Sequence, residues 1–119
     1  MAVDPCPKSP NCVSTKADPA DSKHYMTPVA YEVDASSAIA AIEDVVQAQG
    51  GTVTSTSPNR VEAVFVTSLL KFTDDVVFGL DADAKMLHFK SASRIGHSDL
   101  GANRKRMESI LALLKERLS

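Results

Sequence analysis

The pattern of hydrophobic and polar positions divides the chain into a polar head and a regular body. Residues 1–26 hold four of the six prolines and few apolar side chains, so we expect an irregular arm without a core of its own. From Pro28 onward, apolar residues recur at regular spacing. The stretch VAYEV, residues 29–33, has the period of a half-buried strand. We therefore divide the chain into an arm, residues 1–26, and a single domain, residues 27–119.

A helix and four further strands are predicted in the next part of the domain. Oxygen-bearing side chains at residues 34–37 precede apolar residues at helical spacing, and Gly50 and Gly51 end this helix of about four turns. Strand-forming runs separated by turn residues follow the helix. These runs are TVTST, VEAVFVTSLL, DDVVFGL and KMLHFKSAS.

The last segment, from about Asp99 to Leu118, predicts the strongest helix of the chain. Its apolar stripe consists of Leu100, Met107, Ile110, Leu111, Leu114 and Leu118. The resulting order β-α-β-β-β-β-α favours an α+β fold. We expect a five-stranded antiparallel sheet with both helices packed on one face.

Composition and charge exclude several classes of protein. Hydrophobic residues make up 44% and charged residues 24%, as in soluble globular domains. The formal net charge of -2 provides no basic surface for nucleic acid, so a nucleic-acid partner is not expected. No apolar run is long enough for a transmembrane segment, and no export signal is visible at the N-terminus.

Polar residues interrupt the apolar face of the second helix. On a helical wheel Asn103 and Arg104 point to the core side, whereas Lys105 lies on the opposite face and Arg106 lies at the margin. A guanidinium that points inward is costly unless it is paired. The candidate partners for Arg104 are Asp74, Asp75 and Asp99.

The strand before this helix shows the same substitution of polar for apolar residues. If Leu87 and Phe89 face the core, the alternation of side chains places Ser91 and Ser93 on the core face too. Arg94 then leaves on the other face or in the loop. We predict a polar cluster that includes the helix cap and consists of Ser91, Ser93, Arg94, Ser98, Asp99, Asn103, Arg104 and Arg106.

Three interpretations of this cluster remain open. It can be a sealed network that fixes the helix on the sheet. It can be a site for a small anion, held by Arg104 or Arg94 and the N–H groups of the helix start. It can also be an active site of a small hydrolase or transferase that uses Asp99 with Ser91 or Ser93, although no base and nucleophile pair is evident from spacing.

A protein partner is the further alternative. Val64, Val66, Val77 and Met86 fall on the strand face opposite the helices, where they are expected to form an exposed apolar patch. Such a patch would make the chain a protein-interaction module.

The cysteines and histidines add chemistry of their own. Cys6 and Cys12 enclose five residues and can form a disulfide, remain free thiols, or serve metal or redox chemistry. His24, His88 and His97 are scattered, so each is expected on the surface or in packing rather than in a metal site. The sequence implies no cofactor and no metal.

Two polar stretches resemble the signatures of the domain of unknown function 1499 family. They are CPKSPNCVST near the start and SASRIGHSDLGANRKRMES near the end, with FTDDVVF fitting between them. The matching positions are Cys6, Pro7, Ser9, Pro10, Asn11, Cys12, Ser91, Ser93, Arg94, Gly96, Ser98, Asp99, Gly101, Asn103, Arg104 and Arg106.

The resemblance implies a compartment and a contact, but no established activity. Family members occur in bacteria and plastid-bearing organisms, often with export or lipid-anchor signals, which favours an extracytoplasmic setting such as the periplasm, the cell envelope or the plastid lumen. Motifs at opposite ends of the chain imply that the arm folds back on the helix start. Our leading hypothesis is an exported, non-enzymatic binding or accessory domain with its pocket between the arm and the corner formed by Ser93 to Arg104.

Overall fold

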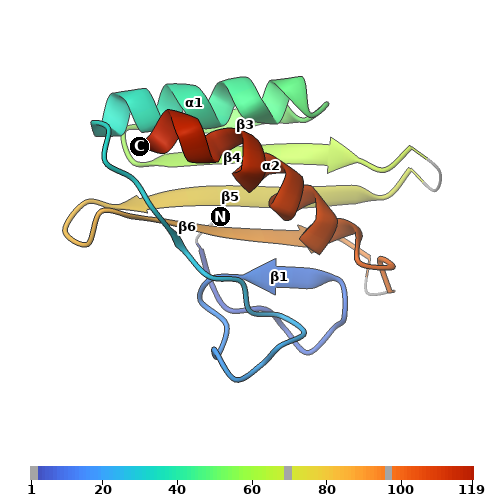
Figure 1. Ribbon diagram of the computed structural model, residues 1–119. Helices are drawn as coiled ribbons and strands as arrows, with labels where there is room; N and C mark the ends of the chain where they lie inside the picture. Colours follow the sequence, from blue (N-terminus) through green and yellow to red (C-terminus); the bar gives the residue numbers. More distant parts are fainter. Residues whose placement is uncertain (1–2, 69–70, 96–97) are drawn as a thin grey trace.

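The computed structural model describes residues 3–68, 71–95 and 98–119, and it has the predicted α+β architecture. Two helices lie on one face of an open antiparallel sheet (Figure 1). The elements in chain order are β1 (Cys12–Ser14), β2 (Val29–Ala30), α1 (Ala35–Ala48), β3 (Thr52–Ser57), β4 (Arg60–Val66), β5 (Thr73–Asp81), β6 (Met86–Ser93) and α2 (Ala102–Leu118).

The four long strands form a meander in the order β6-β5-β4-β3. Two-residue and four-residue connections at residues 58–59 and 82–85 join neighbouring strands, as the turn residues there predict. At one edge of the meander, β1 and β2 both pair with β6, whereas β3 forms the other edge. The sheet thus has six strands, close to the five expected.

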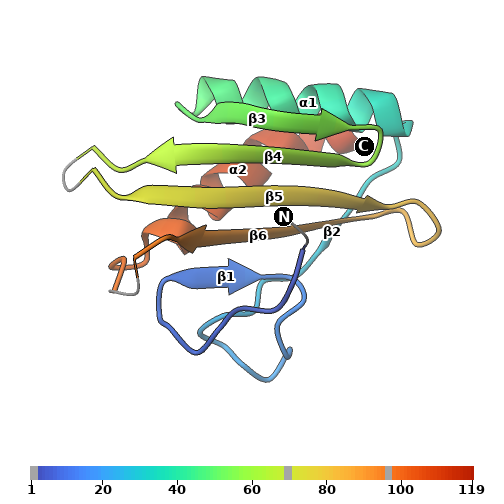
Figure 2. The same cartoon turned by 180° about the vertical axis from the view of Figure 1, so that it is seen from behind.

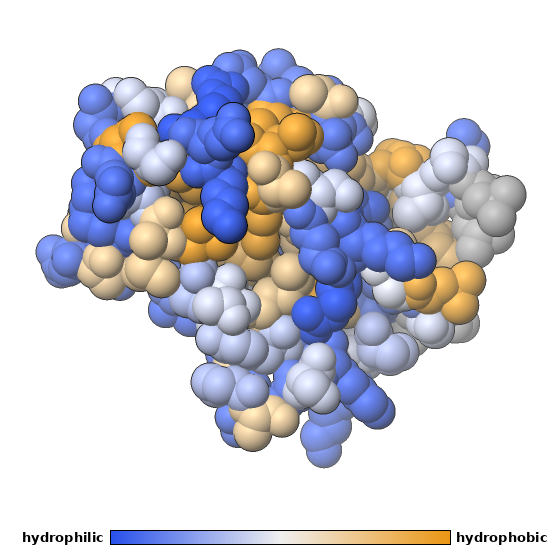
Figure 3. Space-filling model, in the orientation of Figure 1, coloured by the Kyte–Doolittle hydropathy of each residue, from blue (hydrophilic) through white to orange (hydrophobic). Residues whose placement is uncertain are grey.

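The core lies between the sheet and the two helices, as seen from behind in Figure 2. Helix α1 is N-capped by Asp34, whose carboxylate accepts a hydrogen bond of 2.7 Å from Ser37 N. It ends before Gly50, which takes a positive φ of 89° that suits glycine. Its buried face consists of Ala38, Ile39, Ala41, Ile42, Val45 and Val46. On the outer surface of the helical face, hydrophilic residues predominate and hydrophobic residues form interrupted patches (Figure 3).

The arm is not as irregular as its prolines predicted. Residues Cys12–Ser14 form β1, in which Cys12 pairs with Ala92 and Val13 pairs with Ser91 of β6. Three residues free of proline are enough here because β6 offers an otherwise unpaired edge. The arm therefore completes the sheet.

The predicted strand at residues 29–33 is shorter than expected. Only Val29 and Ala30 pair with β6. After them the chain turns toward the end of α2, where the backbone N–H groups of Glu32 and Val33 donate to the carbonyl of Leu118. Hydrogen bonds to the helix end thus replace the strand ladder. The predicted strand at residues 61–70 ends at Val66, and its last two residues lie outside the described residues.

The exposed apolar patch expected on the other face of the sheet is not present. Val77 is 0% exposed, and Val64 and Met86 are partly buried, so Val66 alone of the four is well exposed. The arm contributes to this face, since Val3 lies directly over Gly79 of β5. The expected patch, which suggested an interaction module, is therefore not formed by these four residues.

Neither α1 nor α2 is long and apolar enough to cross a membrane, and the described residues contain no other helix.

Candidate functional site

The start of α2, the end of β6 and the arm meet at one buried carboxamide. Asn103 is fully buried, and its Oδ1 accepts hydrogen bonds of 2.6 Å from Ser91 Oγ and 2.9 Å from Arg106 Nη1. Its Nδ2 lies 3.1 Å from the carbonyl oxygen of Asn11 in the arm. A single side chain thus joins helix, sheet and arm, which places Ser91 and Asn103 together as the sequence predicted.

The same nitrogen also contacts Asp99, which lies before α2. Asn103 Nδ2 lies 2.7 Å from Asp99 Oδ2 and 3.0 Å from Ser93 Oγ. Asp99 in turn accepts hydrogen bonds from the backbone N–H groups of Gly101 and Asn103. Partial burial opposes ionisation of Asp99, but the hydrogen bonds from Asn103 and Gly101 outweigh it and hold the pKa of this carboxyl below its ordinary value. Asp99 is therefore ionised and holds the first turn of α2 through the N–H of Asn103, although the N-cap residue itself is Gly101 and not Asp99.

A buried ion pair lies beneath this network. Arg106 Nη2 is 2.7 Å from Asp74 Oδ2, and Asp74 is fully buried. The guanidinium also lies over the ring of Phe65, 4.7 Å from its centroid. Neither carboxylate oxygen of Asp74 has a directed hydrogen bond among the described residues, so the ionic contact with Arg106 is its main compensation.

Arg106, not Arg104, is therefore the partner of a buried aspartate. The helical wheel placed Arg106 at the margin of the apolar stripe because it considers only the direction at Cα. The long side chain bends back along the helix to reach β5, which the wheel does not capture. The assignment of Asp74, Asp75 or Asp99 to Arg104 is wrong.

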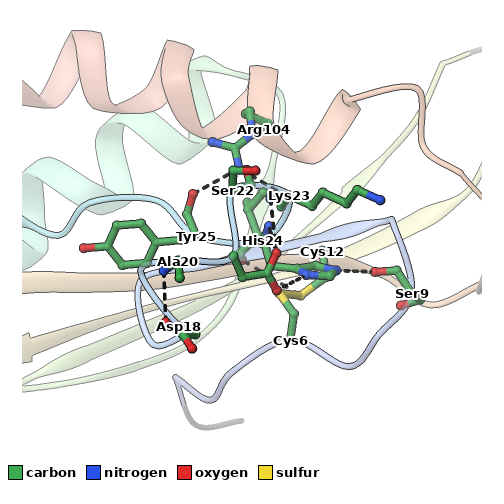
Figure 4. A network of polar contacts seen from close by, with 12 residues as sticks. Cys6, Ser9, Cys12, Asp18, Ala20, Ser22, Lys23, His24, Tyr25 and Arg104 are labelled. Carbon is green, nitrogen blue, oxygen red and sulfur yellow. Dashed lines mark hydrogen bonds and ion pairs between the residues drawn. A yellow bond between two sulfur atoms is a disulfide. The ribbon is translucent and has the colours of Figure 1, made fainter.

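Arg104 instead fastens the arm. Its Nη2 donates to three backbone carbonyl oxygens, those of Ser22 and Lys23 at 3.2 Å and that of Tyr25 at 3.0 Å (Figure 4). These carbonyls belong to one turn of the arm. A guanidinium with several donors in one plane suits such a cluster of acceptors.

The same turn is held from its other side by His24. Its Nδ1 lies 2.6 Å from Asp21 Oδ2. Its Nε2 lies 2.7 Å from the carbonyl oxygen of Ser9 (Figure 4). Both partners are acceptors, so the ring satisfies both only when both nitrogens carry protons. The hydrogen bond to Asp21 and that to Ser9 raise the pKa of His24, and the same ion pair lowers the pKa of Asp21.

A disulfide closes the loop that contains Ser9. The sulfur atoms of Cys6 and Cys12 lie at disulfide-bonding distance. Of the alternatives that the sequence left open for this pair, the structure has the disulfide. No group of histidine, cysteine and carboxylate side chains among the described residues could hold a metal ion.

The remaining members of the predicted cluster lie outside the buried network. Arg94 forms two hydrogen bonds of 2.9 Å with the carboxylate of Asp75, and its side chain is 58% exposed. Ser98 is exposed and accepts a hydrogen bond from Leu100 N. Gly96 and His97 lie outside the described residues.

A pocket of about 270 Å³ opens between the arm and the start of α2. Lys23 and Arg104 line it together with one carboxylate, that of Asp99. The remaining walls are formed by Pro10, Cys12, Val13, Ser98 and Gly101. The pocket thus lies against the network around Asn103 and shares Asp99 with it.

Sequence reasoning missed one hydroxyl and imidazole pair. Thr15 Oγ1 lies 2.9 Å from His88 Nδ1 at the end of β1. Burial and the charge of Lys16 lower the pKa of His88. Thr15 Oγ1 also accepts from the backbone N–H of Phe89, so buried Thr15 and half-buried His88 join the arm to β6. No spacing in the sequence connects residues 15 and 88.

The sequence of the whole chain identifies its protein family. A family model described as protein of unknown function (DUF1499) matches residues 2–114. The chain belongs to the DUF1499 family. Comparisons with curated proteins and with solved structures find no match. In this DUF1499 chain the two signature stretches meet in space, because Asn11 and Asn103 are hydrogen-bonded across 92 positions of sequence.

The buried ion pair gives the first prediction. Arg106→Met should lower the free energy of unfolding by about 3 to 5 kcal/mol, because Asp74 stays buried without its counter-charge. Urea denaturation measures this change. The control is Arg94→Met, which removes an exposed pair and should cost much less than Arg106→Met, because solvent screens an exposed ion pair. A double variant with Asp74→Leu should recover most of the loss, and equal costs for the two arginines would contradict the assignment.

The histidine of the arm gives a second prediction. Because the pKa of His24 is raised on folding, its stabilisation is complete below the ordinary value near 6.5 and is lost as pH rises through the raised pKa. Asp21, with a lowered pKa, loses its contribution only on acidification below its ordinary value.

Melting temperatures of the parent protein and His24→Gln should therefore differ most near pH 6 and converge above the raised pKa of His24. A difference that stays constant from pH 6 to alkaline pH would show that the charge of His24 is not involved.

Proposed function

We propose that this chain is a non-enzymatic binding domain whose pocket between the arm and the start of α2 receives a small anion, a phosphate or a carboxylate. The observation that carries the proposal is the charge of the pocket wall. Lys23 and Arg104 supply two cationic groups, against the single carboxylate of Asp99. Both oxygens of Asp99 already accept hydrogen bonds, so little of its acceptor capacity is left to compete with a ligand.

The free donors of the two cations support this proposal further. No described residue accepts a hydrogen bond from the ammonium group of Lys23, and the hydrogen bonds of Arg104 to described residues all come from Nη2. An anion in the pocket would use the remaining donors and gain charge-assisted hydrogen bonds.

The positions of Ser91, Ser93 and Asp99 give little support to the alternative of a hydrolase or transferase. Ser91 is fully buried and donates its hydroxyl to Asn103, so it is neither accessible nor adjacent to a base. Asp99 has a lowered pKa and accepts hydrogen bonds from the backbone N–H groups of Gly101 and Asn103, which makes it a weak proton acceptor. Ser93 Oγ accepts a hydrogen bond from the side-chain amide of Asn103, which is a donor and not a base that could activate the hydroxyl.

We further propose that the domain works in an oxidising compartment outside the cytoplasm. The pairing of Cys6 with Cys12 supports this location, because small disulfide loops persist where thiols are not kept reduced. Titration with a thiol reagent under denaturing conditions should find no free thiol in protein isolated from its native compartment. Two reactive thiols would exclude this part of the proposal.

The anion proposal is tested by Lys23→Met. Phosphate, sulfate and small carboxylates should raise the melting temperature of the parent protein, since a ligand that binds only the folded state stabilises it. Without ligand, Lys23→Met should melt like the parent protein, because no described residue accepts a hydrogen bond from the ammonium group of Lys23. With anions, the variant should lose most of the increase in melting temperature.

The matched control is Lys105→Met, which removes the same charge from an exposed position of α2 that does not line the pocket. It should keep the shift. Equal shifts in the parent, Lys23→Met and Lys105→Met would exclude binding in this pocket.

A further inference from the structure

The two edge strands of the four-stranded meander, β6 and β3, differ in whether another strand pairs with them. The outer edge of β6 is covered by two short strands, β1 and β2, whereas no described residue pairs with the outer edge of β3. Natural sheets protect a bare edge with charged residues, a proline, a β-bulge or a covering helix or loop. The sequence of β3, TVTSTS, contains no charged residue and no proline. A register irregularity between Val53 and Ser55 affects its first half, and the regular part is Ser55–Ser57.

A groove runs beside this regular part. It has a volume of about 530 Å³ and lies between β3 and the first half of α1. Its apolar wall is formed by Ala35, Ile39, Ala40 and Pro58, and its polar lining by Ser36, Glu43, Thr56 and Ser57. Glu43 is the one charged residue of the lining, and its Oε2 accepts a hydrogen bond of 3.0 Å from Thr56.

The position of α1 decides what can occupy the edge. Both ribbon views show α1 projecting past β3, so that the helix overhangs the place where a further strand would lie (Figures 1 and 2). Two copies paired through β3 would bring their α1 helices to within about 5 Å, the spacing of paired strands. Packed helices need about 8 to 10 Å between axes. The overhang thus opposes antiparallel pairing of β3 with the β3 of a second copy in one continuous sheet, and it leaves room for an extended segment without a helix of its own.

We propose that the outer edge of β3 and the groove under α1 bind an extended peptide segment of another polypeptide by strand addition. Backbone hydrogen bonds to β3 would supply affinity, and alternate side chains would enter the groove. The apolar wall selects a small or branched apolar side chain. The carboxylate of Glu43 selects a lysine or arginine at a neighbouring position on the same face of the segment.

Selection from a phage-displayed library of random linear peptides tests this site on the full chain. Enriched peptides should share apolar residues at alternate positions and a basic residue. Their binding should slow hydrogen exchange of the backbone amides of residues 52–57.

Two matched variants locate the binding site. Ala40→Arg adds a bulky charge to an exposed position in the groove and should weaken the enriched peptides at least about tenfold. Ala48→Arg makes the same change at an exposed position of α1 outside the groove and should leave binding unchanged. Glu43→Lys should shift the selected basic residue to an acidic one.

Three results would overturn the proposal. The first is a selection that enriches no peptide sensitive to Ala40→Arg. The second is peptide binding without protection of residues 52–57. The third is a dimer of the full chain that Ala40→Arg dissociates, because the edge would then serve a second copy.

Discussion

The buried carboxamide of Asn103 is the junction on which the rest of this structure depends. Among the described residues it is the one side chain that hydrogen-bonds to the arm, to β6 and to Asp99 before α2 together. A buried amide left without partners would cost free energy, so each of these elements constrains the positions of the others. The arm, although short and rich in proline, becomes part of the fold through this contact.

The two arginines beside Asn103 extend to different partners. Arg106 reaches under the network to Asp74, and Arg104 turns outward to the carbonyls of the arm. One guanidinium neutralises a charge inside the domain, whereas the other keeps donors at the edge of an open pocket. The sequence offered a structural network and an anion site as alternatives for this polar corner. In the structure the network contains Arg106, and the pocket proposed as an anion site is lined by Arg104.

How much could be predicted depended on the range of the interactions. Alternation in the strands and helical spacing in α1 and α2 are local, and they predicted the fold class correctly. Strand β1 has only three residues and no period of its own, so its existence depends on the edge of β6. The role of His24 depends on the carbonyl of Ser9, a tertiary contact that no sequence spacing encodes. The reach of Arg106 depends on side-chain length, which a helical wheel omits.

Native-state hydrogen exchange tests most directly whether the arm belongs to the cooperative fold. The backbone N–H groups of Ser14 and Thr15 donate to the carbonyls of His24 and Phe89, and they can be compared with the amides of β5. The account predicts that both arm amides exchange with a free energy of opening close to that of β5, and that Asn103→Ala lowers their protection below that of the sheet. Arm amides that exchange through a low-energy opening in the parent protein, while β5 stays protected, would contradict it.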